Sequence, residues 1–194
     1  MAETPTIIIV PGNYCNDIFS GNWYGWLYTC LTEKNVSVKM ETMPDPELAR
    51  ETIWLPKIEQ MAGGVENLAN CIVVGHSSGA VAAMRLAEKC KLKGIVIVSG
   101  YTSDLGDEDE KASGYFNRPW EWEKMKQNCD FIAQFASQDD PFLPIDDQRS
   151  IKKNLGEACD YHEFEKKSHF FDTQQEELLQ VVLKLCGLGC KGQD

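Results

Sequence analysis

The sequence lacks any long apolar run, and no stretch approaches the roughly 20 consecutive apolar residues that a membrane-spanning helix needs. Its first residues, MAETPTIIIVPG, carry no basic segment, and the apolar run at residues 7–10 is too short for the core of a signal peptide. We therefore expect a cytoplasmic protein, with entry into the nucleus by diffusion left open, and no membrane partner.

Basic residues are also scarce. The 19 Lys and Arg stand against 30 Asp and Glu, which gives a net charge of −11. Nucleic acids and anionic membranes both bind basic surfaces, so this balance argues against either as a partner. With 194 residues the chain can bury a stable core without disulfide bonds or bound metal ions. We predict one domain over residues 1–194, with residues 187–194 as a flexible C-terminal tail.

Metal and cofactor signatures are missing. The eight cysteines form no Cys-x-x-Cys pair and no Cys/His zinc pattern, so we expect free thiols and no metal. The run GLGCKG at residues 187–192 matches the glycine fingerprint of dinucleotide-binding proteins, but it follows a predicted helix and not a strand. We discount it and expect no cofactor.

Short apolar runs alternate with helical patterns. Four runs are typical of buried parallel strands and two are weaker strands; they cover residues 6–10, 71–74, 94–99 and 131–136, and then 37–40 and 161–164. Helical spacing predicts helices over residues 23–33, 47–61, 80–87 and 178–186, the second open to a break at Pro56. The alternation predicts an α/β fold, a mostly parallel six-stranded sheet with helices on both faces.

Residues 101–122 do not fit this alternation. An acidic stretch at residues 104–110 precedes the aromatic residues Tyr115, Phe116, Trp120 and Trp122. Two interpretations remain open: a lid over a pocket, or a solvated loop that leads into a surface helix.

The motif Gly75-His76-Ser77-Ser78-Gly79 lies between a predicted strand and an alanine-rich helix. In that position Gly-x-Ser-x-Gly is typical of a nucleophile elbow, where serine occupies a strained turn and side chains in place of the glycines would clash. The N-terminus of the following helix favours negative charge developing at the same point. The motif predicts an α/β-hydrolase fold with Ser77 as nucleophile; the alternative is a simple strand-to-helix turn.

A serine nucleophile needs a base, and the chain has only three histidines. The side chain of His76 should diverge from its neighbour Ser77, and His162 lies inside the last predicted strand. His169 follows that strand, at the sheet edge where ligands bind in open α/β folds, and it comes last in the order serine, acid, histidine. We predict His169 as the base.

The orienting acid should follow the strand at residues 131–136. Asp139 and Asp140 both do, and we favour Asp140 for its spacing to Pro141 and Pro144, with Asp139 as the alternative. A third interpretation is that both only cap the next helix.

Two backbone N–H groups should stabilise the oxyanion. Ser78 directly follows the nucleophile, and Asn13 follows a glycine in the loop after the first strand. For the substrate pocket we predict the aromatic residues Trp23, Tyr115, Phe116 and Phe142, which would suit a hydrophobic acyl or aminoacyl group.

The chain resembles the retinoblastoma-binding protein 9 family of small serine hydrolases over nearly its whole length. The resemblance lies in the blocks IVPGN (residues 9–13), WYGW (23–26), MPDP (43–46), GHSSGA (75–80), YTSDLG (101–106), ASGYF (112–116), RPW (118–120) and DDPFLP (139–144). It implies a compact α/β-hydrolase core without a large cap domain, and a triad at Ser77, Asp140 and His169.

Three departures from the family stand out. Ser168 precedes the base, where the family usually has glycine, and residues 154–160 contain a short insertion. The Leu-x-Cys-x-Glu segment said to bind the retinoblastoma protein is absent from the corresponding residues 58–66 and from the rest of the chain. Binding to the retinoblastoma protein is therefore not implied.

Three functions fit these residues. The first is hydrolysis of a small ester or amide through an acyl-enzyme. The second is a non-catalytic binding module on a hydrolase scaffold, against which the complete apparent triad argues. The third is acyl transfer or thioester cleavage, which would use the same residues.

Overall fold

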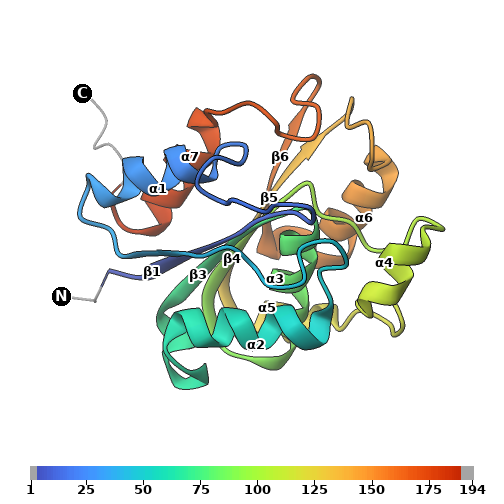
Figure 1. Ribbon diagram of the computed structural model, residues 1–194, viewed down its shortest axis with the longest axis horizontal. Helices are drawn as coiled ribbons and strands as arrows, with labels where there is room; N and C mark the ends of the chain where they lie inside the picture. The colour runs from blue at the N-terminus through green and yellow to red at the C-terminus, as the bar shows by residue number, and fades with distance from the viewer. Residues whose placement is uncertain (1–3, 189–194) are drawn as a thin grey trace.

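The computed structural model describes residues 4–188. Six strands form one sheet in the order β2-β1-β3-β4-β5-β6, and every neighbouring pair is parallel (Figure 1). The strands are β1 (Thr6–Val10), β2 (Val38–Met40), β3 (Cys71–His76), β4 (Leu92–Val98), β5 (Cys129–Ser137) and β6 (Cys159–Phe164). The predicted α/β fold with a parallel six-stranded sheet is confirmed.

Helices cover both faces of the sheet (Figure 1). One face packs against α1 (Tyr24–Thr32) and α7 (Glu176–Leu185). The other packs against α2 (Glu51–Ala62), α3 (Ser78–Lys89), α5 (Trp122–Asn128) and α6 (Ile145–Leu155). The short α4 (Glu108–Ser113) stands at the periphery, and 3₁₀ turns occupy Val65–Asn70 and Gly156–Ala158. None of the helices in this part of the chain has the length and hydrophobicity to cross a membrane.

The central strands are mainly apolar because both of their faces are covered. In β1, Ile7 and Ile9 pack into the core on the α1 side, while Ile8 and Val10 pack into the core on the α2 side. All six residues of β3 are buried. Since β3 lies between β1 and β4, the turn that follows it opens at the middle of the sheet edge.

The helix predicted over residues 47–61 begins at Glu51 and runs through Pro56 without a break. Pro56 lies on the exposed side of α2, so the carbonyl that its missing N–H leaves free can bind water. Buried Trp54 and Ile58 anchor the helix on either side.

The sequence prediction gave no residue range for α4, α5 or α6. Helix α4 lies within residues 101–122, which it left open between lid and loop, α5 begins at the last of these residues as the surface helix of the second interpretation, and α6 had been considered only as a helix that Asp139 and Asp140 might cap. Within α6 only Ile151, Leu155 and the polar Gln148 are buried, which gives a weak apolar pattern. Residues 189–194, most of the predicted tail and of the GLGCKG run, lie outside the described residues.

Candidate active site

Ser77 occupies a tight turn between β3 and α3. Its backbone has φ 54° and ψ −120°, a conformation that costs on the order of 1–3 kcal/mol for a residue with a side chain. The flanking glycines are sterically required, because a Cβ on Gly75 would lie 2.2 Å from the Gly79 carbonyl oxygen, and one on Gly79 would lie 2.4 Å from that of Val10. The Ser77 N–H is held by the Val98 carbonyl at 2.9 Å. The turn is thus confined by β1 and β4, the two strands that flank β3.

His169 and Asp140 meet at the same edge of the sheet. Asp140 follows β5 and His169 follows β6, and Nδ1 of the imidazole lies 2.8 Å from Oδ2 of the carboxylate. The Asp140 side chain is fully buried and also accepts hydrogen bonds from the Ser99 hydroxyl at 3.1 Å and the N–H groups of Phe142 and Leu143 at 3.0 and 3.1 Å. Every lone pair that burial removes from water therefore has a donor.

Burial would raise the pKa of Asp140, but the hydrogen bond and charge of His169, together with the N–H groups of Phe142 and Leu143, outweigh it and hold the pKa below its usual range. The carboxylate is therefore ionised and can only accept, so the hydrogen in this contact sits on Nδ1 of His169. In the neutral ring Nε2 is then left without a hydrogen, as a base requires.

The carboxylate of Asp139 binds different partners from that of Asp140. One of its oxygens accepts from the Ser137 hydroxyl and from the N–H groups of Lys167 and Ser168, at 2.8, 3.2 and 2.7 Å. It thereby ties down the loop that carries His169 without touching the imidazole. Geometry thus separates the two aspartates that the sequence left in competition.

The His169 loop is conformationally strained. Ser168 has φ 50° and Phe170 has φ 53°, the left-handed region that favours glycine. This gives a physical reason for the glycine that the resembling family usually has before the base. Contacts from Asp139, Asp140 and His76 to this loop offset the strain.

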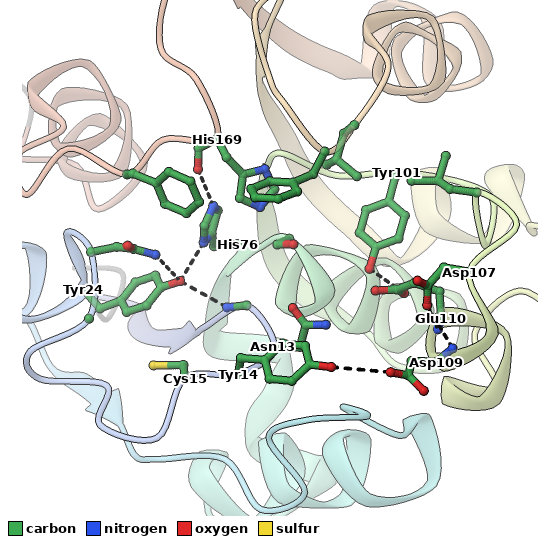
Figure 2. A pocket seen from close by; sticks show the side chains of 18 residues that line it. Asn13, Tyr14, Cys15, Tyr24, His76, Tyr101, Asp107, Asp109, Glu110 and His169 are labelled. Atoms are coloured by element: carbon green, nitrogen blue, oxygen red, sulfur yellow. Dashed lines mark hydrogen bonds between the residues drawn. The ribbon is translucent and has the colours of Figure 1, made fainter.

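Ser77 and His169 line one pocket of about 710 Å³. Its wall comes from loops and helix ends at the carboxyl edge of the sheet: Gly12, Asn13, Tyr14, Cys15, Gly21, Asn22, Tyr24, His76, Ser77, Tyr101, Leu105, Asp107, Asp109, Glu110, Phe142, Leu143, His169 and Phe171 (Figure 2). Among residues 4–188 no hydrogen bond joins the Ser77 hydroxyl to the imidazole. Such bonds are often long in free enzymes and shorten when substrate binds.

Two backbone N–H groups remain available beside Ser77. In the loop after β1, Gly12 donates to the Tyr24 hydroxyl at 3.1 Å and Tyr14 donates to the Pro46 carbonyl, which leaves Asn13 between them. Ser78 opens α3, where an N–H has no acceptor within the helix. The loop lies close to the nucleophile, because a Cβ on Gly12 would be 3.2 Å from that of Ser77.

The predicted aromatic pocket is mostly wrong. Phe142 does line the pocket. Trp23 and Tyr115, however, are fully buried in the two cores that flank the sheet, and Phe116 packs between Tyr101 and Trp120. These side chains are large and mainly apolar, so they pack into or against the core and do not line the pocket.

A buried arginine explains where the aromatic segment goes. Arg85 of α3 donates to the carbonyls of Tyr115, Arg118 and Pro119, and its guanidinium lies 3.6 Å from the centre of the Trp120 ring. The polar half of the segment instead supplies Asp107, Asp109 and Glu110 to the pocket wall. The segment is therefore part wall and part core, a combination of the two interpretations that the sequence left open.

The acidic wall faces the pocket from α4 and its N-terminal cap (Figure 2). Tyr101 donates to Glu110 at 2.7 Å, and Tyr14 donates to Asp109 at 3.4 Å. Burial and then the neighbouring carboxylates raise the pKa of Glu110, although the bond from Tyr101 acts against them. The sequence analysis left the acidic stretch open between lid and loop, and it did not assign Tyr14, Tyr101 or Phe171 to the pocket, because none of them belongs to a catalytic motif.

Metal-binding side chains do not cluster here. Across residues 4–188 no group of three or more His, Cys, Asp or Glu residues is placed to hold a metal ion.

Comparisons with known proteins place this geometry in context. A family model described as "Serine hydrolase" matches residues 7–176. Serine hydrolase RBBP9 of Rattus norvegicus is 46% identical over 183 residues, 94% of this chain and 96% of that protein.

Solved structures agree on the fold. The ydeN gene product of B. subtilis matches with a TM-score of 0.82 and 22% identity, over 95% of this chain and 100% of that chain. MGS-M1, an alpha/beta hydrolase enzyme from a Medee basin deep-sea metagenome library, matches with a TM-score of 0.66 and 18% identity, over 96% of this chain and 86% of that chain. These two likenesses concern the fold alone.

Proposed function

The chain belongs to the serine hydrolase family, and from that premise we propose that it cleaves a small ester or amide through an acyl-enzyme formed on Ser77. In this proposal His169 is the general base and Asp140 orients it. Membership of the family confirms the resemblance drawn from the sequence motifs, and it makes the protein a hydrolase.

The steps follow from the groups around Ser77. As the serine oxygen attacks the substrate carbonyl carbon, its proton passes to Nε2 of His169. The carbonyl oxygen becomes negative and accepts from the N–H groups of Asn13 and Ser78, while the Asp140 carboxylate stabilises the imidazolium. The imidazolium then protonates the leaving alcohol or amine. Water repeats the sequence on the acyl-enzyme, releasing the acid and restoring Ser77.

One observation carries the proposal. The buried Asp140 carboxylate lies 2.8 Å from Nδ1 of His169, and that imidazole lines the same pocket as the strained Ser77 turn. A structural aspartate–histidine pair would not need to open into a pocket beside a serine held at φ 54°.

The pocket wall supports a substrate with an apolar group and a positive charge. The rings of Phe142 and Phe171 lie 5.1 and 5.3 Å from the His169 ring, which gives the acyl group an apolar surface. Across the pocket stand the carboxylates of Asp109 and Glu110 (Figure 2). A hydrophobic aminoacyl ester or amide, with its amine protonated, complements both surfaces. A hydrophobic acyl group without an amine would use only the first.

Matched substrates separate these two cases. We would compare the p-nitrophenyl esters of phenylalanine and of 3-phenylpropionate, which differ only in the amino group, with wild type and with Ser77→Ala. We expect Ser77-dependent cleavage of both, with kcat/KM relative to each ester's own hydroxide-catalysed hydrolysis at least about tenfold higher for the phenylalanine ester, since a hydrogen bond to a charged group is worth roughly 1.5–3 kcal/mol and ~1.4 kcal/mol is tenfold. Equal ratios would exclude the aminoacyl preference, and turnover by Ser77→Ala equal to wild type would exclude the hydrolase mechanism itself.

A further inference from the structure

His76, the residue before Ser77, is a buried titratable group that the catalytic steps do not use. It is 1% exposed, and its ring packs against those of Trp23, Tyr24 and His169, with centroids 5.8, 5.8 and 4.8 Å away. Both of its ring nitrogens have partners. Nδ1 lies 2.6 Å from the Tyr24 hydroxyl and Nε2 lies 2.9 Å from the carbonyl oxygen of His169 (Figure 2).

The direction of each hydrogen bond in this cluster is determined. A carbonyl oxygen can only accept, so the hydrogen of His76 is on Nε2. Burial, and then the neighbouring His169, lower the pKa of His76 to about 3, so the ring is neutral and its Nδ1 must accept from Tyr24. With its one hydrogen committed, the Tyr24 oxygen accepts the N–H of Gly12 at 3.1 Å and the side-chain amide of Asn22 at 3.2 Å.

The result is a directed chain of bonds from Gly12 N–H, through the Tyr24 hydroxyl and the His76 ring, to the His169 carbonyl. Its two ends attach to main chain. One end is next to Asn13, the oxyanion donor of the proposed mechanism, and the other is the backbone of the proposed base. Gly12 lies in the loop after β1 and His169 in the loop after β6. Strand β6 forms one edge of the sheet, and only the short β2 lies beyond β1 at the other edge. No sheet hydrogen bond therefore links them directly.

We propose that Tyr24 and His76 are positioning residues, which hold the oxyanion loop and the base loop in register across Ser77. This inference rests on the proposed function. The His169 loop needs such a tether, because residues on both sides of the histidine are in the left-handed conformation. The Gly12 loop needs one too, because a Cβ on Gly12 would lie only 3.2 Å from that of Ser77, so any shift of this loop moves the Asn13 N–H relative to the nucleophile.

Removing one oxygen tests the chain. Tyr24→Phe keeps the ring that packs against Trp23 and His76 but leaves Gly12 N–H and His76 Nδ1 without partners. We expect kcat to fall roughly tenfold to a hundredfold, with KM changed less than about twofold, since small misplacements of reacting groups act on the transition state. Tyr28→Phe is the matched control: Tyr28 lies one turn further along α1, packs against Phe19, and is expected to keep wild-type kcat.

A double-mutant cycle distinguishes positioning from loss of folding. His76→Gln keeps a donor able to reach the His169 carbonyl but breaks the contact with Tyr24. If the two residues act as one chain, Tyr24→Phe combined with His76→Gln should lose little more activity than the worse single variant. All rates are taken per active site, titrated with a fluorophosphonate probe, so that unfolded protein does not count.

Two results would overturn the inference while leaving the hydrolase proposal intact. One is a Tyr24→Phe enzyme with wild-type kcat per titrated site. The other is losses that multiply fully in the double variant, which would make the two side chains independent. Failure of the proposed function looks different, because wild type and Ser77→Ala would then be labelled and turn over alike.

Discussion

Changing Asp140 to asparagine isolates the charge of the orienting group with almost no change in shape. The carboxylate accepts four hydrogen bonds, from His169, Ser99, Phe142 and Leu143. In Asp140→Asn the amide oxygen can keep the two backbone N–H donors, which share Oδ1. The amide NH₂ then takes the place of Oδ2, where it faces the imidazole.

An NH₂ group can only donate, so Nδ1 of His169 must give up its hydrogen and accept. The single hydrogen of the neutral ring moves to Nε2, the nitrogen that has to take the proton from Ser77. The imidazolium that forms in the transition state also loses its buried anion. We expect kcat/KM to fall by about 10⁴-fold, which corresponds to roughly 5.4 kcal/mol of transition-state stabilisation.

The neighbouring carboxylate provides the control. Asp139 uses one oxygen for all three of its hydrogen bonds, so Asp139→Asn can retain them while removing a charge of the same sign one residue away. We expect this variant to stay within about threefold of wild type. The assay is kcat/KM at pH 7.5 on the phenylalanine ester, with circular dichroism to verify that both variants fold.

Two outcomes would refute this reasoning. If Asp139→Asn lost as much activity as Asp140→Asn, net negative charge near the site would matter, and not the contact with the imidazole. If Asp140→Asn kept more than about a tenth of wild-type activity, the tautomer of His169 would not be set by this side chain.

Three further predictions concern stability. Arg85→Met should lower the unfolding free energy by about 3–5 kcal/mol in urea denaturation, because the buried Glu88 carboxylate loses both bonds from Arg85 and keeps only the Glu121 N–H and a 3.9 Å approach of Arg118; a change below about 1 kcal/mol would contradict the structural role of this arginine. His76 is neutral in the fold but protonates below pH 6.5 when unfolded, so wild type should lose stability as pH falls from 6.5 toward 3. His76→Gln should lose about 2 kcal/mol less than wild type between pH 7 and pH 5, and identical losses would refute the buried neutral ring. Gly79→Ala places a methyl group 2.4 Å from the Val10 carbonyl oxygen, so thermal unfolding should show a loss of about 2 kcal/mol or more, and an unchanged melting temperature would mean that the elbow has room to move.

The sheet could be predicted from the sequence because its strands are buried on both faces. Residues 7–10 and 71–74 contain no charged or amide side chain, and the alternation of such runs with helices limits the topology to a parallel α/β arrangement. Helix α6 escaped prediction for the opposite reason. It buries one side only, and that side includes the polar Gln148, which is buried because its side chain hydrogen-bonds to the Ser137 main chain.

In the candidate site, too, some residues could be predicted from the local sequence and others depend on distant contacts. Ser77 could be proposed because its surroundings are local, a turn whose steric demands appear as glycines two residues either side. His169 could be proposed because few histidines compete. Spacing to Pro141 and Pro144 favoured Asp140 over Asp139, but which of the two carboxylates meets the imidazole depends on a loop 29 residues further along the chain, and only the structure shows that contact.

The pocket wall was the least predictable part. Tyr115 and Phe116 follow an acidic stretch that does reach the pocket, so their position in the chain suggested a place there too. Their actual position is set by Arg85, which binds the main chain of that segment from another helix. Long-range contacts of this kind decide which aromatic residues enter a core and which remain beside a site.

The central claim is a covalent acyl intermediate on Ser77 that His169 makes possible. The most direct test is to mix the protein with a p-nitrophenyl ester, quench in acid within the first turnover, and map the adduct by peptide mass spectrometry. We expect one acyl group on the peptide that contains Ser77 in wild type, at least a hundredfold slower acylation in His169→Ala, and no adduct in Ser77→Ala. An acyl group on another residue, or equal acylation rates with and without His169, would contradict the account.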